Sequence, residues 1–227
     1  MQNESTPDSG ATRLSRESIV AAAMRLAARP DVVALRIRDI GQELGVDPSA
    51  VYRHFPSKEV LMSALADELL AEVGRRRDVT GLTWKDRLRE TANSLLDVYL
   101  EYPSIGADVA LLPTSTTGVK DQIEGILDAL HEAGLRDEEL VDQYALFSSY
   151  LLSFASTIAR SHTSFGRDSD LRRPWVPDAV SATRSRHPRM AALRDDLLEL
   201  VDVEVFRRGI ELLLDGIERE GRRASEE

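Results

Sequence analysis

The sequence predicts an all-α fold, with a small helical domain at the N-terminus and a larger one after it. Apolar residues recur every three or four positions along most of the chain, and they nowhere alternate strictly as in a half-buried strand. Ser, Thr or Asp residues suited to capping precede these segments, and Gly or Pro follows most of them. Near the N-terminus, Gly45, Val46 and Asp47 alone connect two short helical segments, a spacing typical of a helix-turn-helix.

The first elements are a tail and two helices. Residues 1–12 are polar and contain Pro and Gly, which predicts a disordered tail. Ser15 can cap the first helix, and Pro30 lies in the segment that breaks it. The apolar positions of the first helix are Ile19, Ala22, Ala23 and Leu26, and those of the second are Ile37, Ile40 and Leu44. Gly45 is well placed to end the second helix.

Both ends of the third helix carry residues that start or stop helices. Asp47 can cap its N-terminus, and Pro48 suits the first helical position because no partner is needed there for the missing N–H. Pro56 ends it, and Ser57 can cap a connecting helix over residues 57–75. A helix of about two turns is unstable alone. Neighbouring helices must therefore hold it, and we interpret its exposed side chains as functional.

A second, larger domain is predicted over residues 82–222, after a charged and turn-rich boundary at residues 74–81. Thr83 and Asp86 form a predicted capping box for its first helix. Further helices are expected over about 120–132 and 138–161, followed by a short helix near 189–193 that leads into a last long helix ending near 219. Residues 163–188 are polar and interrupted by Pro, which predicts a long loop.

The composition indicates a soluble chain. Of 227 residues, 42% are hydrophobic and 30% charged, none is Cys, and no apolar run approaches the ~18 residues of a membrane span. The N-terminus lacks an apolar segment, so no signal peptide is expected and the predicted location is the cytoplasm. The net charge is −10, yet residues 13–58 carry eight Lys/Arg and five Asp/Glu. This asymmetry suggests a basic module on an acidic body, with ordinary scatter as the alternative.

The third helix has the features of a recognition helix. Val51 and Phe55 are expected to pack on the second helix, which leaves polar and basic side chains on the other faces. In such helices the N-terminal residues meet base edges, and flanking cations hold phosphates. Ser49 and Ala50 are therefore predicted to meet bases, Ala50 against a thymine methyl group. The predicted DNA-contacting residues are Arg36, Arg38, Ser49, Ala50, Tyr52, Arg53, His54 and Lys58. The alternative is a small helical subdomain with solvated Arg and His.

The segment DPSAVYRHFPSKEVLMSAL, residues 47–65, resembles the DNA-binding region of the TetR family of bacterial transcriptional regulators. The resemblance extends over residues 14–66. It departs at Arg36, where the family usually has a capping Ser or Thr, and at Pro30, where Gly is common. FRRGIELLLDGIE, residues 206–218, resembles the final helix of TetR-type ligand-binding domains. The resemblance implies a dimeric repressor that leaves double-stranded DNA when a small molecule occupies the C-terminal domain.

Large apolar side chains in the C-terminal half indicate where such an effector could bind. A ligand site is mainly apolar with a few orienting polar groups. The candidate lining residues are Leu96, Tyr99, Leu111, Leu127, Phe147, Tyr150, Leu151 and Phe154, with His162 and Trp175 at the mouth. The alternative is that these side chains form ordinary core.

A stripe of mostly small residues on two helices predicts a close helix–helix contact. Its members are Ala145, Ser148, Leu152, Ala155 and Ala159, with Val205, Gly209, Leu212 and Gly216 on the last helix. We expect these stripes to meet across a two-fold axis in a homodimer, or alternatively to pack inside one subunit. Because one short helix reads few bases, a dimer should bind a near-palindromic operator.

Signatures of catalysis are missing from the sequence. His131 and Glu132 are not followed by a second His at metalloprotease spacing, and no Gly-rich phosphate loop or nucleophile elbow occurs. The sequence therefore predicts a non-enzymatic regulator without metal or cofactor. A helix-turn-helix activator or architectural DNA-binding protein without a small-molecule effector remains the alternative.

Overall fold

The computed structural model describes residues 14–29, 31–109, 112, 117–165 and 181–224, and these residues form helices and no strands. The helices are α1 (Arg16–Ala27), α2 (Ile37–Leu44), α3 (Pro48–His54), α4 (Lys58–Arg76), α5 (Trp84–Glu101), α6 (Pro103–Gly106), α7 (Thr117–Glu132), α8 (Asp137–Phe165), α9 (Pro188–Ala192), α10 (Arg194–Glu199) and α11 (Asp202–Ala224). The predicted tail at 1–12, Pro30, Leu111 and Trp175 lie outside the described residues. The all-α prediction is confirmed.

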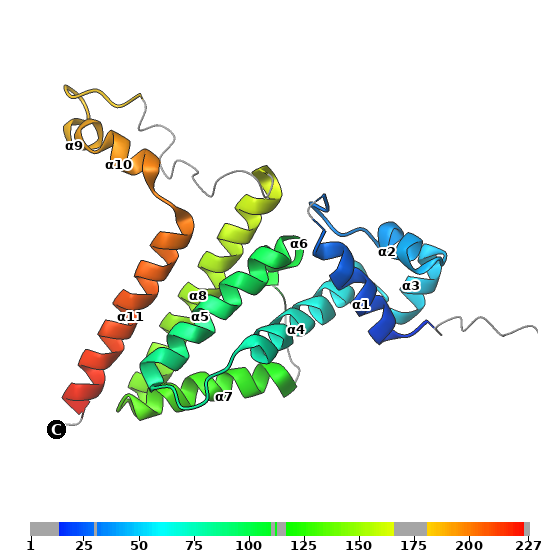
Figure 1. Ribbon diagram of the computed structural model, residues 1–227, viewed down its shortest axis with the longest axis horizontal. Coiled ribbons are helices and arrows are strands. Elements are labelled where there is room, and N and C mark those ends of the chain that lie inside the picture. The colour runs from blue at the N-terminus through cyan, green and yellow to red at the C-terminus, as the bar shows by residue number, and fades with distance from the viewer. Residues whose placement is uncertain (1–13, 30, 110–111, 113–116, 166–180, 225–227) are drawn as a thin grey trace, which may run out of the picture.

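The N-terminal helices form a small unit around the start of α4. Figure 1 shows α1, α2 and α3 at one end of the molecule, with α4 running from them into the larger bundle. Fully buried side chains from three helices, Ile19, Val51 and Leu65, belong to its core, and Phe55 is buried directly after α3. The short α3 is therefore held by packing that its own length could not supply.

The predicted helix caps are present. Ser15 and Ser18 form a capping box at α1, and the Asp47 carboxylate accepts a hydrogen bond from the Ser49 N–H at 2.8 Å. Ser57 caps α4 through the N–H of Val60 at 3.3 Å. Hydrogen bonds from Ser49 hold the pKa of Asp47 below its ordinary value, so this cap is charged at neutral pH.

The larger part of the molecule is a helical bundle with α8 at its centre. α8 packs against α5, α6, α7 and α11, while α4 packs against α5 and α7. The largest fully buried side chains of the bundle include Tyr99, Phe147 and Phe206 from α5, α8 and α11. Because α4 also packs against α1, it belongs to both the small unit and the bundle.

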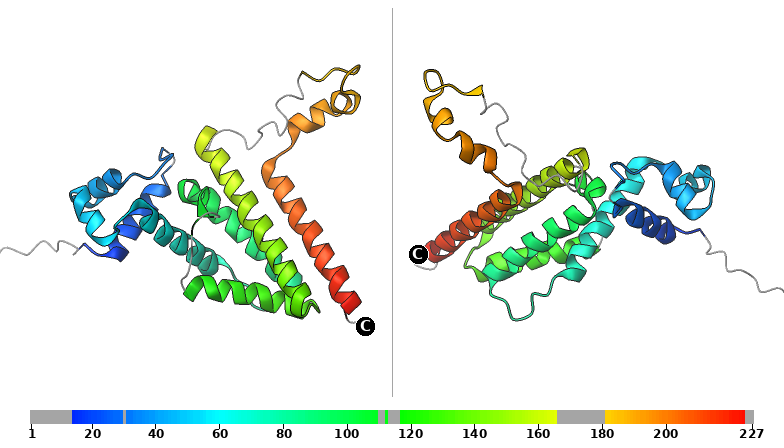
Figure 2. Two further views of the ribbon diagram at one scale, coloured as in Figure 1. Left: turned by 180° about the vertical axis from the view of Figure 1, so that it is seen from behind. Right: turned by 45° about the horizontal axis from the view of Figure 1, so that its top comes forward.

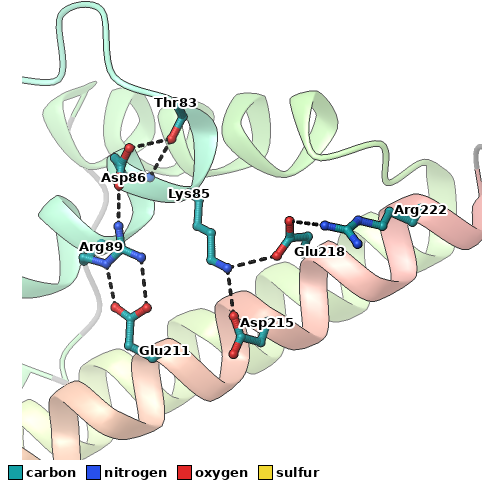
Figure 3. A network of polar contacts seen from close by, with 8 residues as sticks. All are labelled: Thr83, Lys85, Asp86, Arg89, Glu211, Asp215, Glu218 and Arg222. Carbon is teal, nitrogen blue, oxygen red and sulfur yellow. Dashed lines mark hydrogen bonds and ion pairs between the residues drawn. The ribbon is translucent and has the colours of Figure 1, made fainter.

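A network of ion pairs joins α5 to α11 on the outside of the bundle (Figure 3). Lys85 Nζ donates to the carboxylates of Asp215 at 2.8 Å and Glu218 at 3.0 Å. The guanidinium of Arg89 donates two hydrogen bonds to the carboxylate of Glu211, at 2.6 and 2.9 Å. These contacts link residues more than a hundred positions apart and hold the C-terminal half of α11 against the start of α5.

The predicted short helix near 189–193 and the last long helix are present as α9 and α11, but a further helix, α10, separates them. The chain forms α9 and α10, leaves helical geometry at Leu200 (φ −58°, ψ 130°), and begins α11 at Asp202. No residue of α9 or α10 is buried, and Figure 2 shows both helices standing away from the bundle. Neither helix packs extensively against another helix of the described chain, although Arg194 donates to the backbone carbonyl of Ala182, so little tertiary contact holds this arm in line with α11.

Candidate nucleic-acid interface and internal cavity

Two glycines shape the turn between α2 and α3. Gly45 adopts the left-handed conformation at φ +66°, and its N–H donates to the carbonyl of Gln42 at 3.1 Å. A Cβ atom on Gly41 would lie 2.9 Å from the carbonyl oxygen of Val46, so the turn passes too close to α2 for a side chain there. The turn therefore fixes how α3 is presented relative to α2.

Most of the predicted DNA-contacting side chains reach the surface. Tyr52 is 47% exposed and His54 is half-buried. The other exposed members of the set are Arg36, Arg38, Ser49, Arg53 and Lys58. Ala50 is a correction to the prediction, because it lies on the buried side of α3 beside Val51 and is only 9% exposed. That position leaves too little surface for the predicted contact with a thymine methyl group.

Three of these cations make no ion pair in the described part of the chain, although Asp47 and Glu59 interact electrostatically with Arg53 and Lys58. No carboxylate lies within ion-pair distance of Arg36, Arg53 or Lys58, whereas Arg38 Nε donates to Asp39 at 3.3 Å. Arg36 also stands at the N-cap of α2 without capping it through its side chain. Unpaired, exposed cations around a short exposed helix are suited to phosphate oxygens.

Arg16 is a functional candidate that the sequence reasoning missed. Its Nη1 donates to the backbone carbonyl of His54, the last residue of α3, at 2.5 Å. The same guanidinium lies 4.1 Å above the ring of Phe55, which is fully buried. Arg16 therefore braces the end of α3 against α1. An arginine at the first position of a helix carries no signal of this role until the fold brings α3 beside it.

A cavity of about 160 Å³ lies between α4, α5, α7 and α8. Its lining residues are Leu70, Thr91, Leu95, Val119, Gln122, Ile123, Ile126, Tyr144, Ser148, Leu151 and Leu152. The wall is mostly apolar, with a few polar groups that could orient a ligand. The hydroxyl of Ser148 is buried and has no hydrogen-bond partner among the described residues. An unsatisfied buried hydroxyl costs free energy unless a ligand or water binds it.

Most of the predicted pocket residues lie elsewhere. Leu151 lines the cavity, but Leu96, Tyr99 and Phe147 are fully or almost fully buried in the core. The half-buried members are Leu127, Tyr150, Phe154 and His162. The rings of Tyr150 and Phe154 stack on Phe206 of α11, at centroid distances of 5.9 Å. Leu96, Tyr99 and Phe147 belong to the core, as the alternative expects, and Tyr150 and Phe154 pack against it. The helical spacing of apolar residues does not distinguish core residues from cavity-lining residues, because both kinds face the interior of the bundle.

The predicted dimer stripe divides in two. Ala155 and Ala159 are fully buried within the chain, Ser148 and Leu152 line the cavity, and a side chain on Gly209 would collide with Tyr150. Ala155 and Ala159 are packed inside the chain and Gly209 makes room for Tyr150, which favours the alternative of packing inside one subunit for these three, whereas Ser148 and Leu152 face the cavity. The contact across a two-fold axis stays a prediction. The remaining four members, Ala145, Val205, Leu212 and Gly216, retain exposed or half-exposed surface.

The described residues hold no cluster of three or more His, Cys, Asp or Glu side chains that could bind a metal ion. In the same part of the chain, no helix combines the length and apolarity that crossing a membrane requires.

Comparison with known proteins identifies both parts of the chain. Residues 19–65 match the tetR family of bacterial regulatory proteins, and residues 79–220 match the tetracyclin repressor-like C-terminal domain. The chain is 26% identical over 210 residues to the HTH-type transcriptional repressor DrrR1 of Streptomyces coeruleorubidus, covering 90% of this chain and 77% of that protein. It is 28% identical over 214 residues to the tetracycline repressor protein class D of Escherichia coli, covering 91% and 90%.

Among solved structures, the TetR family protein ActR of Streptomyces coelicolor in complex with actinorhodin is similar at a TM-score of 0.73. The sequence identity is 21%, and the match covers 92% of this chain and 99% of that chain. The predicted resemblance of the N-terminal region to the TetR family is confirmed, with a match over residues 19–65, and so is the order of a helix-turn-helix domain followed by a larger helical domain. The chain belongs to the TetR family of bacterial transcriptional regulators.

Proposed function

We propose that the protein is a dimeric repressor that binds a near-palindromic operator through α3 and leaves it when an organic ligand fills the cavity. One observation carries the proposal: α4 has the unpaired Lys58 beside the recognition helix at one end and Leu70 in the cavity wall further along. The two residues are about 18 Å apart along the helix axis. A ligand that moves Leu70 therefore moves an element that also contacts DNA.

The DNA-binding part of the proposal follows the geometry of α3. Ser49 is the exposed residue at its N-terminus and is assigned to base contacts, while Arg36, Tyr52, Arg53 and Lys58 are assigned to phosphates. We assign residues 13–58 to DNA binding, residues 57–75 to the connecting helix, and residues 82–222 to ligand binding and dimerisation. Two relatives named as repressors, DrrR1 and the class D protein, support the direction of regulation.

Exposed apolar residues support a revised dimer surface. Val141 and Leu146 on α8 are 59% and 55% exposed, and Leu212 on α11 is 63% exposed. Beside them, a side chain on Gly216 would meet nothing within 4 Å. Burying such residues against a second copy removes their apolar surface from water. We assign the homodimer contact to these outward faces of α8 and α11.

The switch follows from which form of the protein a ligand prefers. A ligand releases DNA only if it binds more tightly to a form whose two recognition helices no longer fit the operator. In the present form the cavity of about 160 Å³ has room for a small ring system, and α4 forms part of its wall. The same fold in ActR holds actinorhodin, which supports binding of an organic molecule. A regulator without an effector is the second candidate, and neither role is enzymatic.

The test begins with selection of bound duplexes from random DNA, which should return near-palindromic sites with half-sites about one helical turn apart. Compounds that bind the protein are then measured by calorimetry with and without operator. Binding should weaken by roughly 5- to 150-fold when operator is present, and operator binding by the same factor when ligand is present. Replacing Ser148 by Phe fills the cavity, so this variant should bind operator and ignore the ligand. Equal ligand affinities in the two conditions would leave a constitutive DNA binder.

A further inference from the structure

Arg77 is a half-buried cation that makes no ion pair in the described chain and contacts the cavity wall from behind. It directly follows α4, and its Nη1 donates to the hydroxyl oxygen of Thr91, a residue of the cavity wall, at 2.7 Å. Its Nε is buried and has no hydrogen-bond partner among the described residues. No carboxylate of the described chain lies within 4 Å of its guanidinium, in contrast to Arg75 and Arg76, which both pair with Glu72.

The surroundings of Arg77 are electrostatically unfavourable for its charge. Burial, and then repulsion from Arg87, lower the pKa of Arg77, while Glu90 opposes this more weakly. Arg87 is itself paired with Glu132, and its Nε is also buried without a hydrogen-bond partner in the described structure. An arginine side chain stays charged in proteins. Two guanidinium groups thus lie close to each other behind a mostly apolar cavity wall, and each has a buried Nε–H without an acceptor in the described structure.

The guanidinium of Arg77 lies close to the backbone of α7 at Gly125. Gly125 has no side chain, and a Cβ atom placed there would lie 3.5 Å from Arg77 Nη2. One turn earlier on α7, Gln122 lines the cavity and donates to the backbone carbonyl of Leu70 on α4. The guanidinium therefore lies between α5 and α7, one hydrogen bond behind the cavity wall.

We propose that the cavity takes an organic anion, an aromatic or other apolar ring body bearing a carboxylate that Arg77 binds. The apolar wall would hold the ring, the buried hydroxyl of Ser148 would gain a partner, and the carboxylate would replace Thr91 as the acceptor for Arg77. This inference rests on the proposed function only in taking the cavity as the effector site.

The position of Arg77 gives such a ligand a direct connection to the DNA-binding end. Arg77 is the C-cap residue of α4, the helix that begins at Lys58. A carboxylate that draws the guanidinium toward the cavity therefore moves the end of this helix. A neutral ligand of the same shape would lack this contact and would depend on Leu70 alone.

The test compares a naphthalene carboxylate with the matching naphthalene carboxamide, which has the same shape without the charge. Calorimetry on the full chain at neutral pH should give a tighter dissociation constant for the carboxylate by about tenfold to a hundredfold. Arg77→Gln should abolish this preference, and Arg77→Lys should retain part of it. Arg75→Gln, which changes an exposed, ion-paired arginine at the same end of α4, is the matched control and should leave the preference intact.

The outcomes separate this inference from the proposed function. Equal affinities for carboxylate and carboxamide, or binding of neither, would overturn the anion site, and this comparison needs only the unmodified protein. A preference for the carboxylate that survives in a folded Arg77→Gln variant would assign the charge recognition to another residue and overturn the role of Arg77. If the carboxylate binds through Arg77 but operator affinity is unchanged, the anion site stands and the proposed release mechanism fails.

Discussion

The cations at the two ends of the molecule are used in opposite ways. At the DNA-binding end, Arg36, Arg53 and Lys58 are exposed, and none makes an ion pair within 4 Å in the described chain. Between α5 and α11, Lys85 and Arg89 each bind two carboxylates, and their side chains are only 25% and 34% exposed (Figure 3).

The difference shows which charges are available to a ligand. A phosphate that approaches Arg53 or Lys58 does not have to break an ion pair, and it releases counterions from the DNA. A phosphate that approaches Arg89 would first have to displace Glu211, which already makes two hydrogen bonds to it. Paired cations therefore stabilise the fold, and unpaired ones mark a surface for an anionic partner. Arg77 shares one property with each group, because it is half-buried like the paired cations and makes no ion pair, like the cations at the DNA-binding end.

The largest expected effect comes from removing the unpaired cations. The double variant Arg53→Ala with Lys58→Ala removes about four phosphate contacts from a dimer, so the slope of log affinity against log salt should fall by about 3 to 4. Affinity at moderate salt should drop by about two orders of magnitude, for specific and random DNA alike. Filter binding or fluorescence anisotropy over a salt series measures both quantities.

The matched control is Lys85→Ala, which removes a paired cation. Its salt slope and DNA affinity should equal those of the unmodified protein. A comparable loss of DNA affinity in both variants would mean that the distinction between paired and unpaired cations does not predict DNA contacts.

A smaller effect is expected at Arg16, which belongs to the DNA-binding end but is engaged with the protein. Arg16→Ala removes the hydrogen bond to the His54 carbonyl and the contact with the Phe55 ring. The end of α3 should loosen, which lowers operator affinity by about tenfold while random-DNA affinity changes little. The salt slope should stay the same, because a positioning residue contributes no phosphate contact. If Arg16→Lys restores affinity fully and Arg16→Ala flattens the slope, Arg16 binds phosphate instead.

The smallest expected effect concerns the α5–α11 network. Arg89→Gln should lower the thermal midpoint at neutral pH by about 1 to 3 °C, because a partly exposed ion pair is worth only about 0.5 to 1 kcal/mol. The hydrogen bond from Arg89 lowers the pKa of Glu211. A lowered pKa means that the stabilisation is complete above the ordinary carboxyl range and is lost as the pH falls through the lowered value. Calorimetric scans should therefore show that the thermal midpoints of the unmodified protein and of Arg89→Gln converge in acid. A difference between them that does not change with pH would mean that the ion pair with Glu211 is not its cause.

Short-range sequence signals are sufficient to predict the helices of the DNA-binding end. Caps at Ser15, Asp47 and Ser57 and the stop at Gly45 act between residues within a few positions of each other, so they were readable before the fold was known. The same holds for the exposed set on α3, since a two-turn helix has few ways to bury Val51 and Phe55. The burial of Ala50 could not be predicted in this way, because it depends on how closely the turn after α2 passes Gly41 and brings α3 to α2.

The sequence by itself determined the helices, their order and the basic reading surface, because capping and periodicity are short-range properties. Tertiary structure alone decided which inward-facing stripe became core, cavity or partner surface. Phe147 and Leu151 lie one turn apart on α8, yet the first fills the core and the second lines the cavity. Likewise Arg77 gives no signal among the neighbouring arginines, since its missing counterion is a fact about α5 and α7 rather than about residues near it in sequence. A cavity forms where side chains from different helices do not fill the space between them, and a charge stays unpaired where no opposite charge from another helix reaches it. The spacing of residues within one helix carries no information about either.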